Sequence, residues 1–214
     1  MGPMLPIFLN IPKNSAKRQD LVLVPVYLTL LHTHIRNRHG ALVTTAVTNM
    51  DLHDISRSAR TYGVKSFFLV TPIVDQHELV ERILGHWRTE QSKAYHPDRV
   101  EALSLIRMVK SFEEVKSIVR TNHGGAEPEV VLTDAKRFPN SISYAEYRNE
   151  LLNPARSNRP VILVFGTGWG VSDSFYPEVH RILAPVYGPE GAEGYNHLSV
   201  RAAAAIILDR LFGK

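Results

Sequence analysis

The chain has 214 residues, 44% of them hydrophobic, and carries a formal net charge of +4 at pH 7. This length and apolar content are sufficient for one sizeable core. The chain contains no cysteine, which excludes disulfides and thiolate metal sites, and no apolar run is long enough to span a bilayer. The positive charge permits an anionic partner, and the lack of cysteine is compatible with a cytoplasmic protein.

The N-terminal segment shows no regular pattern. Residues 1–20 mix proline, asparagine, lysine and arginine, so we expect a mobile arm ahead of a single domain over residues 21–214. The first residues contain two prolines and no basic stretch, which makes a poor signal peptide. Pro25 interrupts the apolar run that follows, so the first strand is expected to begin near Val26.

A polar, basic turn separates this strand from the first helix signal. Residues 32–40 form the turn, and Ala41–Thr48 favours a second strand. A helix is then expected over Asp51–Tyr62, with Asp51 as its N-cap and Gly63 as its stop. Its apolar residues share one face of the helix, and a second stripe is formed by His53, Arg57 and Arg60.

Strand and helix patterns alternate along the remaining chain. Strands are expected at Ser66–Thr71, Leu105–Val109, Glu129–Leu132, Val161–Phe165 and Arg181–Ala184. Helices are expected at Asp75–Arg88, Phe112–Thr121, Tyr144–Leu152, Val171–Tyr176 and Ser199–Phe212. This alternation predicts an α/β fold whose sheet is mostly parallel and carries helices on both faces.

A glycine-rich loop follows the most apolar strand. Val161–Phe165 leads directly into Gly166-Thr167-Gly168-Trp169-Gly170. Glycine allows a ligand to approach the backbone closely, so we expect a small molecule to bind here. Thr133 follows the preceding strand, Leu183 ends the next one, and a polar loop opens the last helix. Because the carboxyl ends of parallel strands meet at one edge of a sheet, these loops are predicted to form one pocket.

Several ligands are compatible with a glycine loop, and its spacing separates them. A nicotinamide fingerprint requires G-x-G-x-x-G near the start of a βαβ unit, whereas this loop reads G-x-G-x-G near the C-terminus. Rossmann-fold methyltransferases need several more strands after such a loop, and the 44 residues that follow Gly170 are too few to form them. A P-loop would end in Gly-Lys-Ser/Thr, whereas this loop ends in Gly170-Val171-Ser172, which has no lysine. An alternative is that the segment is only a tight turn, in which the glycines allow close packing and bind no ligand.

Three motifs of this chain resemble those of the SPOUT RNA methyltransferases. They are Asp51–Val64, Val161–Ser172 and Tyr195–Ile206, and the likeness extends from about Val26 to Leu211. The resemblance implies a C-terminal trefoil knot and S-adenosyl-L-methionine as cofactor. It also implies RNA (tRNA or rRNA) as substrate, and a homodimer whose active site is built across two subunits.

The resemblance also implies roles for individual residues. The cofactor is expected to contact Thr133, Gly166, Thr167, Gly168, Trp169, Gly170, Leu183, Asn196, His197, Leu198 and Ser199. Arg57 takes the place of the motif arginine and is expected to orient the acceptor nucleotide. Asp51 is favoured as an N-cap over a base, and His53 is a further candidate base. Arg36, Arg38, Arg57 and Arg60 are expected to contact RNA phosphates.

Two departures from the family pattern keep alternatives open. Asp51 stands where asparagine is common, and the glycine loop lacks the usual glutamate. A catalytically inactive relative that binds RNA or a metabolite therefore remains an alternative. A nucleotide-binding α/β oxidoreductase is a further one, which the position of the loop argues against. No metal site is expected, because the His32-x-His34 pair lacks further ligands at a known spacing.

Overall fold

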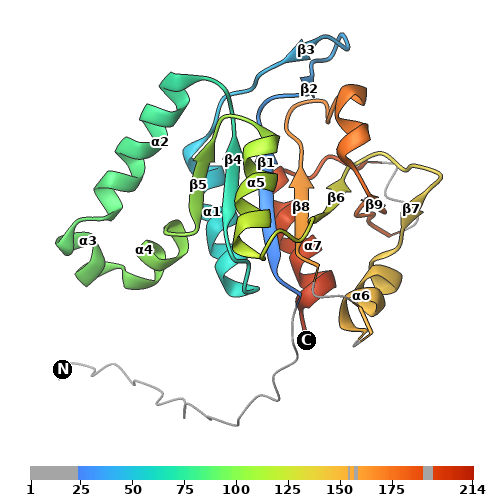
Figure 1. Ribbon diagram of the computed structural model, residues 1–214. Helices are drawn as coiled ribbons and strands as arrows, with labels where there is room; N and C mark the ends of the chain where they lie inside the picture. The colour runs from blue at the N-terminus through green and yellow to red at the C-terminus, as the bar shows by residue number, and fades with distance from the viewer. Residues whose placement is uncertain (1–23, 154, 157–158, 190–194) are drawn as a thin grey trace, which may run out of the picture.

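A seven-stranded sheet with helices on both faces forms the centre of the computed structural model (Figure 1). The structure describes residues 24–153, 155–156, 159–189 and 195–214. The predicted arm at residues 1–20 lies outside these described residues. None of the described helices is long and apolar enough to cross a membrane.

All neighbouring strands of the large sheet are parallel. Their order across the sheet is β5-β4-β1-β8-β6-β9-β7. The bounds are β1 Val26–Leu31, β4 Phe67–Val70, β5 Ile106–Val109, β6 Glu129–Thr133, β7 Ser141–Ile142, β8 Val161–Phe165 and β9 Arg181–Leu183. Strands β1 and β8 lie side by side in the middle and are buried on both faces, which explains their continuous apolar sequence.

The helices divide between the two faces of the sheet (Figure 1). Helices α1 (Asn49–Thr61), α2 (Val74–Trp87), α4 (Pro97–Leu103), α6 (Tyr144–Leu152) and α7 (Val200–Phe212) pack on one face. Helix α5 (Phe112–Asn122) and the 3-10 helix η1 (Asp173–Glu178) pack on the other. Because successive side chains of a strand alternate, Leu28 and Leu30 contact the first layer, whereas Tyr27 and Leu31 contact the second.

Two segments extend from these layers. Strands β2 (Ile35–Arg36) and β3 (Leu42–Val43) form a separate antiparallel hairpin. The short helix α3 (Glu90–Tyr95) joins α2 to α4. The hairpin lies at the end of the molecule toward which β8 points (Figure 1).

The structure confirms the predicted α/β architecture and corrects several boundaries. The strand expected at Ala41–Thr48 is wrong beyond Leu42–Val43, because this segment continues as a loop that leads into α1. The N-cap of α1 is Thr48 and not Asp51: the Thr48 hydroxyl accepts a hydrogen bond from the Asp51 backbone N–H. The helix expected at Val171–Tyr176 is the 3-10 helix η1. The trefoil knot stays a prediction.

Candidate functional site

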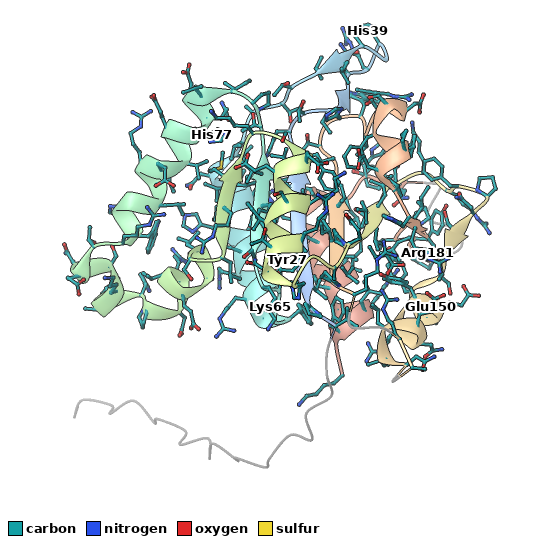
Figure 2. All side chains as sticks on the ribbon, in the orientation of Figure 1. Tyr27, His39, Lys65, His77, Glu150 and Arg181 are labelled. Atoms are coloured by element: carbon teal, nitrogen blue, oxygen red, sulfur yellow. The ribbon has the colours of Figure 1, made fainter. Side chains whose placement is uncertain are left out.

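A pocket of about 710 Å³ opens at the carboxyl ends of the central strands. The loops after β1, β6, β8 and β9 and the start of α7 contribute to its wall. Its lining includes His32, Thr45, Thr48, Asp51, Thr133, Asp134, Lys136, Gly166, Thr167, Gly168, Trp169, Gly170, Val186, Asn196, His197, Leu198 and Ala203. In Figure 2, His39 marks the hairpin at this end of the molecule, and Lys65 marks the opposite end.

The glycine loop is held tightly against the β2 strand. The Trp169 N–H donates to the Arg36 carbonyl at 3.2 Å, and the Arg36 N–H donates to the Gly170 carbonyl at 3.0 Å. Gly168 has a φ of 57°, and a Cβ there would lie 3.0 Å from Ile35 Cγ2. The glycines therefore permit close packing as well as forming a backbone wall of the pocket.

A chain of hydrogen bonds links this loop to the residue that follows β1. Thr167 Oγ1 donates to the Leu31 carbonyl at 3.0 Å and lies 2.6 Å from Thr45 Oγ1. Thr45 Oγ1 in turn lies 3.0 Å from His32 Nδ1. His32 is fully buried, and this burial lowers its pKa to about 4. The imidazole is thus neutral at physiological pH.

Two carboxylates lie in the pocket wall. Asp51 is buried in the first turn of α1, and its Oδ1 is 3.8 Å from Arg201 Nε. Asp134 follows β6, and its Oδ1 accepts a hydrogen bond from the Lys136 N–H at 2.8 Å. Burial raises the pKa of Asp134, although that hydrogen bond opposes the shift. The site therefore offers anionic or proton-accepting groups next to a neutral imidazole.

The three predicted catalytic residues do not lie together. Asp51 lines the pocket, whereas His53 and Arg57 are not part of its wall. The His53 ring packs against Trp87 at a centroid distance of 5.4 Å, and burial followed by the Arg99 charge lowers the pKa of His53. Arg57 is exposed, and its guanidinium makes no hydrogen bond or ion pair with the described residues.

Most of the predicted cofactor residues lie in the pocket wall. They are Thr133, Gly166, Thr167, Gly168, Trp169, Gly170, Asn196, His197 and Leu198. Leu183 is instead the last residue of β9 and is fully buried in the core, and Val186, three residues later, lines the pocket. The Ser199 hydroxyl caps α7 by accepting a hydrogen bond from the Ala202 N–H at 3.2 Å.

The predicted phosphate-binding arginines fall into two separate groups. Arg36 forms an ion pair with Asp173, and Arg38 Nε donates to His39 Nε2 at 2.9 Å, both on the hairpin side. Arg57 and Arg60 lie on α1, where Arg60 is paired with Glu101. The first two arginines therefore belong to the segment of the β2–β3 hairpin and the other two to α1, and their contact with RNA phosphates stays a prediction.

Sequence reasoning placed Asp134 beside Thr133 in a loop at this edge of the sheet without giving it a role, and it did not assign His32, Thr45 and Lys136 to the pocket. Their positions directly after β1 and β6, or within the loop before α1, could have indicated that they line the pocket. Among the residues that the structure describes, no cluster of three or more histidine or acidic side chains could hold a metal.

Comparison with known proteins shows the family. A family model described as SAM-dependent RNA methyltransferase matches residues 25–213. The chain belongs to this S-adenosylmethionine-dependent RNA methyltransferase family. The match confirms the predicted enzyme class and cofactor, and it removes the oxidoreductase alternative.

Two curated relatives extend this result. An uncharacterized protein of Aquifex aeolicus is 38% identical over 189 residues, covering 88% of this chain and 89% of its own length. A tRNA (guanine-N(1)-)-methyltransferase of Nitratidesulfovibrio vulgaris is 40% identical over 190 residues, covering 88% of this chain. The match spans only 42% of the length of that relative, so the activity in the relative's name belongs to a longer protein.

Solved structures support the fold. A putative methylase family protein from Neisseria gonorrhoeae has a TM-score of 0.57 at 16% identity, covering 100% of this chain and 87% of that chain. The SpoU methyltransferase AviRb from Streptomyces viridochromogenes has a TM-score of 0.53 at 16% identity, covering 88% and 58%. At this level of identity, the likeness shows a shared methyltransferase fold.

Proposed function

We propose that this RNA methyltransferase acts on tRNA as a homodimer in the cytoplasm, with S-adenosylmethionine in the pocket at the strand ends. The observation that supports this proposal most strongly is the convergence of the glycine loop, the Thr133–Lys136 loop and Asn196–Leu198 on one pocket. The buried carboxylate of Asp51 lies in the same wall. The tRNA methyltransferase relative supports the choice of RNA, although the chain covers less than half of it.

The chemistry of the pocket fits this cofactor. A volume of about 710 Å³ is within the range of small-molecule sites. The glycine loop supplies a backbone wall, and Val186, Ala203 and Ile207 supply apolar surface. The neutral His32 imidazole adds no positive charge to a pocket that would hold a cationic cofactor. These residues would hold S-adenosylmethionine, which supplies an electrophilic methyl group when bound.

Asp51 is the residue of the pocket best suited to accept a proton from the acceptor nucleotide. Its carboxylate is buried in the first turn of α1 and lines the pocket. Its Oδ1 lies 3.8 Å from Arg201 Nε. A methyl acceptor that carries a proton requires such a base. Because Thr48 supplies the N-cap, the Asp51 carboxylate is not needed for capping and is available for this role.

Exposed apolar side chains around the pocket support the homodimer. Trp169 and Leu198 line the pocket and are 63% and 46% exposed. Met50 precedes Asp51 and is 60% exposed, while Tyr195 precedes Asn196 and is 73% exposed. Apolar surface gathered at one place is typical of a protein interface.

Transfer of labelled methyl groups tests the proposal. Purified protein, radiolabelled S-adenosylmethionine and total RNA from cells that lack the enzyme should yield labelled tRNA, and mapping then identifies the nucleotide. We expect Asp51→Asn to abolish transfer while cofactor binding persists. Asp54→Asn is the matched control, because Asp54 Oδ2 also lies 3.8 Å from Arg201 but is not in the pocket wall. Label found only in rRNA would contradict the choice of tRNA.

A further inference from the structure

One of the residues that line the pocket carries a buried polar atom that the described residues leave without a partner. This atom is Nε2 of His32, a side chain with no exposed surface. No other pocket-lining residue has such an atom in the described parts of the chain. Buried polar atoms in native proteins nearly always have a partner, so this nitrogen requires one that the described residues do not supply.

The surrounding hydrogen bonds determine which ring nitrogen of His32 carries the proton. Thr167 uses its single hydroxyl hydrogen on the Leu31 carbonyl, so Thr45 must donate to Thr167. With its own hydrogen used, Thr45 can only accept from His32 Nδ1. The imidazole is therefore held as the Nδ1–H tautomer, and Nε2 carries a free lone pair.

The charge state of His32 agrees with this arrangement. Burial keeps the pKa of His32 at about 4, so Nε2 is a hydrogen-bond acceptor throughout the physiological range. The other charged side chains of the pocket wall are Asp51, Asp134 and Lys136. None of them forms a hydrogen bond or ion pair with His32 in the described structure.

We propose that His32 Nε2 is a cofactor-recognition group that accepts a hydrogen bond from an N–H or O–H of bound S-adenosylmethionine. Its depth favours the cofactor over the RNA: His32 is fully buried, whereas Trp169 and Leu198 form the exposed rim that a polynucleotide would meet first. The bonds through Thr45 to Thr167 couple this acceptor to the glycine loop. The assignment rests on the proposed placement of the cofactor in this pocket.

Calorimetry with the unreactive product S-adenosylhomocysteine tests this role. His32→Asn keeps a donor near the Nδ1 position but has no acceptor near Nε2, so we expect binding to weaken roughly 10-fold. His32→Gln places an amide oxygen near Nε2 and should restore most of the affinity. Thr45→Val leaves the ring in place but frees its tautomer, so it should also weaken binding. His123→Asn is the matched control, because His123 pairs with Tyr27 outside the pocket.

Nitrogen-15 NMR of the wild-type imidazole provides a measurement that needs no substitution. We expect a protonated Nδ1 and an unprotonated Nε2, whose resonance moves upfield when S-adenosylhomocysteine binds. An Nε2–H tautomer overturns the proposal, as does wild-type affinity in His32→Asn. If the wild-type protein does not bind S-adenosylhomocysteine, the proposed placement of the cofactor in this pocket is wrong as well. Weaker RNA binding with unchanged affinity for S-adenosylhomocysteine would place the donor on the RNA and overturn the proposal.

5′-Methylthioadenosine, which lacks the amino acid, locates the donor on the cofactor. If His32→Asn weakens both ligands equally, the donor belongs to the nucleoside. If the loss is confined to S-adenosylhomocysteine, the donor is the α-ammonium group. Either result supports the proposal, whereas unchanged affinity for both ligands contradicts it.

Discussion

Gly168 has a backbone conformation that residues with a side chain adopt only with strain. Its φ is 57°, and a Cβ would lie 3.0 Å from Ile35 Cγ2 and 3.4 Å from the Arg36 carbonyl oxygen. We therefore expect Gly168→Ala to lower the free energy of unfolding by about 1–2 kcal/mol and to weaken cofactor binding. Urea denaturation and calorimetry measure these effects.

Gly85 supplies the control for this substitution. It lies inside α2, away from the pocket, and nothing occupies the space around an added Cβ. Gly85→Ala should raise the free energy of unfolding by roughly 0.5–1 kcal/mol, because alanine is the better helix former. If Gly168→Ala behaved like Gly85→Ala, the loop would not depend on its backbone conformation.

Glu129 gives the fold a dependence on acid pH at the opposite end of the sheet. It is buried and accepts bonds from Arg156 and from the Tyr147 hydroxyl, the latter at 2.9 Å. Burial alone would raise the pKa of Glu129, but Arg156 and then Tyr147 outweigh it, so the net shift is downward. The stabilising contribution is therefore present above the unfolded-state pKa and is lost as the pH falls through the lower folded-state value.

Equilibrium unfolding across this pH range measures the contribution. We expect the wild type to lose stability as the pH falls below about 4.5. Arg156→Met should lower the free energy of unfolding at pH 7 by roughly 3 kcal/mol, because it leaves a buried carboxylate without its main partner. It should also remove most of the acid-dependent loss. An unchanged pH profile in Arg156→Met would show that Glu129 does not cause it.

At the scale of elements, the N-cap of α1 connects stability to the site. The Thr48 hydroxyl accepts from the Asp51 N–H at 3.2 Å and so fixes the first turn, from which Asp51 faces the pocket. Thr48→Ala should lower the free energy of unfolding by about 1 kcal/mol and reduce methyl transfer. Ser143 caps α6 in the same way, outside the pocket wall. Ser143→Ala should cost similar stability but leave methyl transfer unchanged, and equal activity losses would contradict this view.

The elements that the sequence predicted well are those with a strong pattern of their own. Strands β1 and β8 are buried on both faces, so each reads as an unbroken apolar run. Helix α3 has no buried residue and β7 has only two residues, so neither leaves a hydrophobic pattern to detect. The start of α1 was placed late because Asp51 and Thr48 are both good caps, and only the tertiary structure selects between them.

The pocket was predictable where its residues are contiguous in sequence. The glycine loop and Asn196–Leu198 are short motifs, and both line the pocket. His32 was missed because its role depends on partners that are distant in sequence, namely Thr45 and, through it, Thr167. Neither the lone pair of the imidazole nor its neutral state can be inferred before these loops are brought together.

At the scale of the whole molecule, Asp51 and Arg57 of one subunit do not both line the pocket. Asp51 lines the pocket, whereas Arg57 is exposed six residues further along α1 and lies outside the pocket wall. If the motif arginine takes part in catalysis, a second subunit is the simplest source for it. We therefore expect each proposed site to combine Asp51 of one subunit with Arg57 of the other.

Mixing two inactive variants tests this arrangement. Asp51→Asn and Arg57→Ala should each abolish methyl transfer. In a randomly mixed dimer population, about half of the molecules contain one subunit of each kind, and each of these has one intact site. Co-expression of the two variants should therefore restore about a quarter of the wild-type activity. Co-expression of Asp51→Asn with Asp51→Ala should restore none, since every site then lacks the carboxylate. If the first mixture also stays inactive while sedimentation shows dimers, Arg57 does not act across the interface.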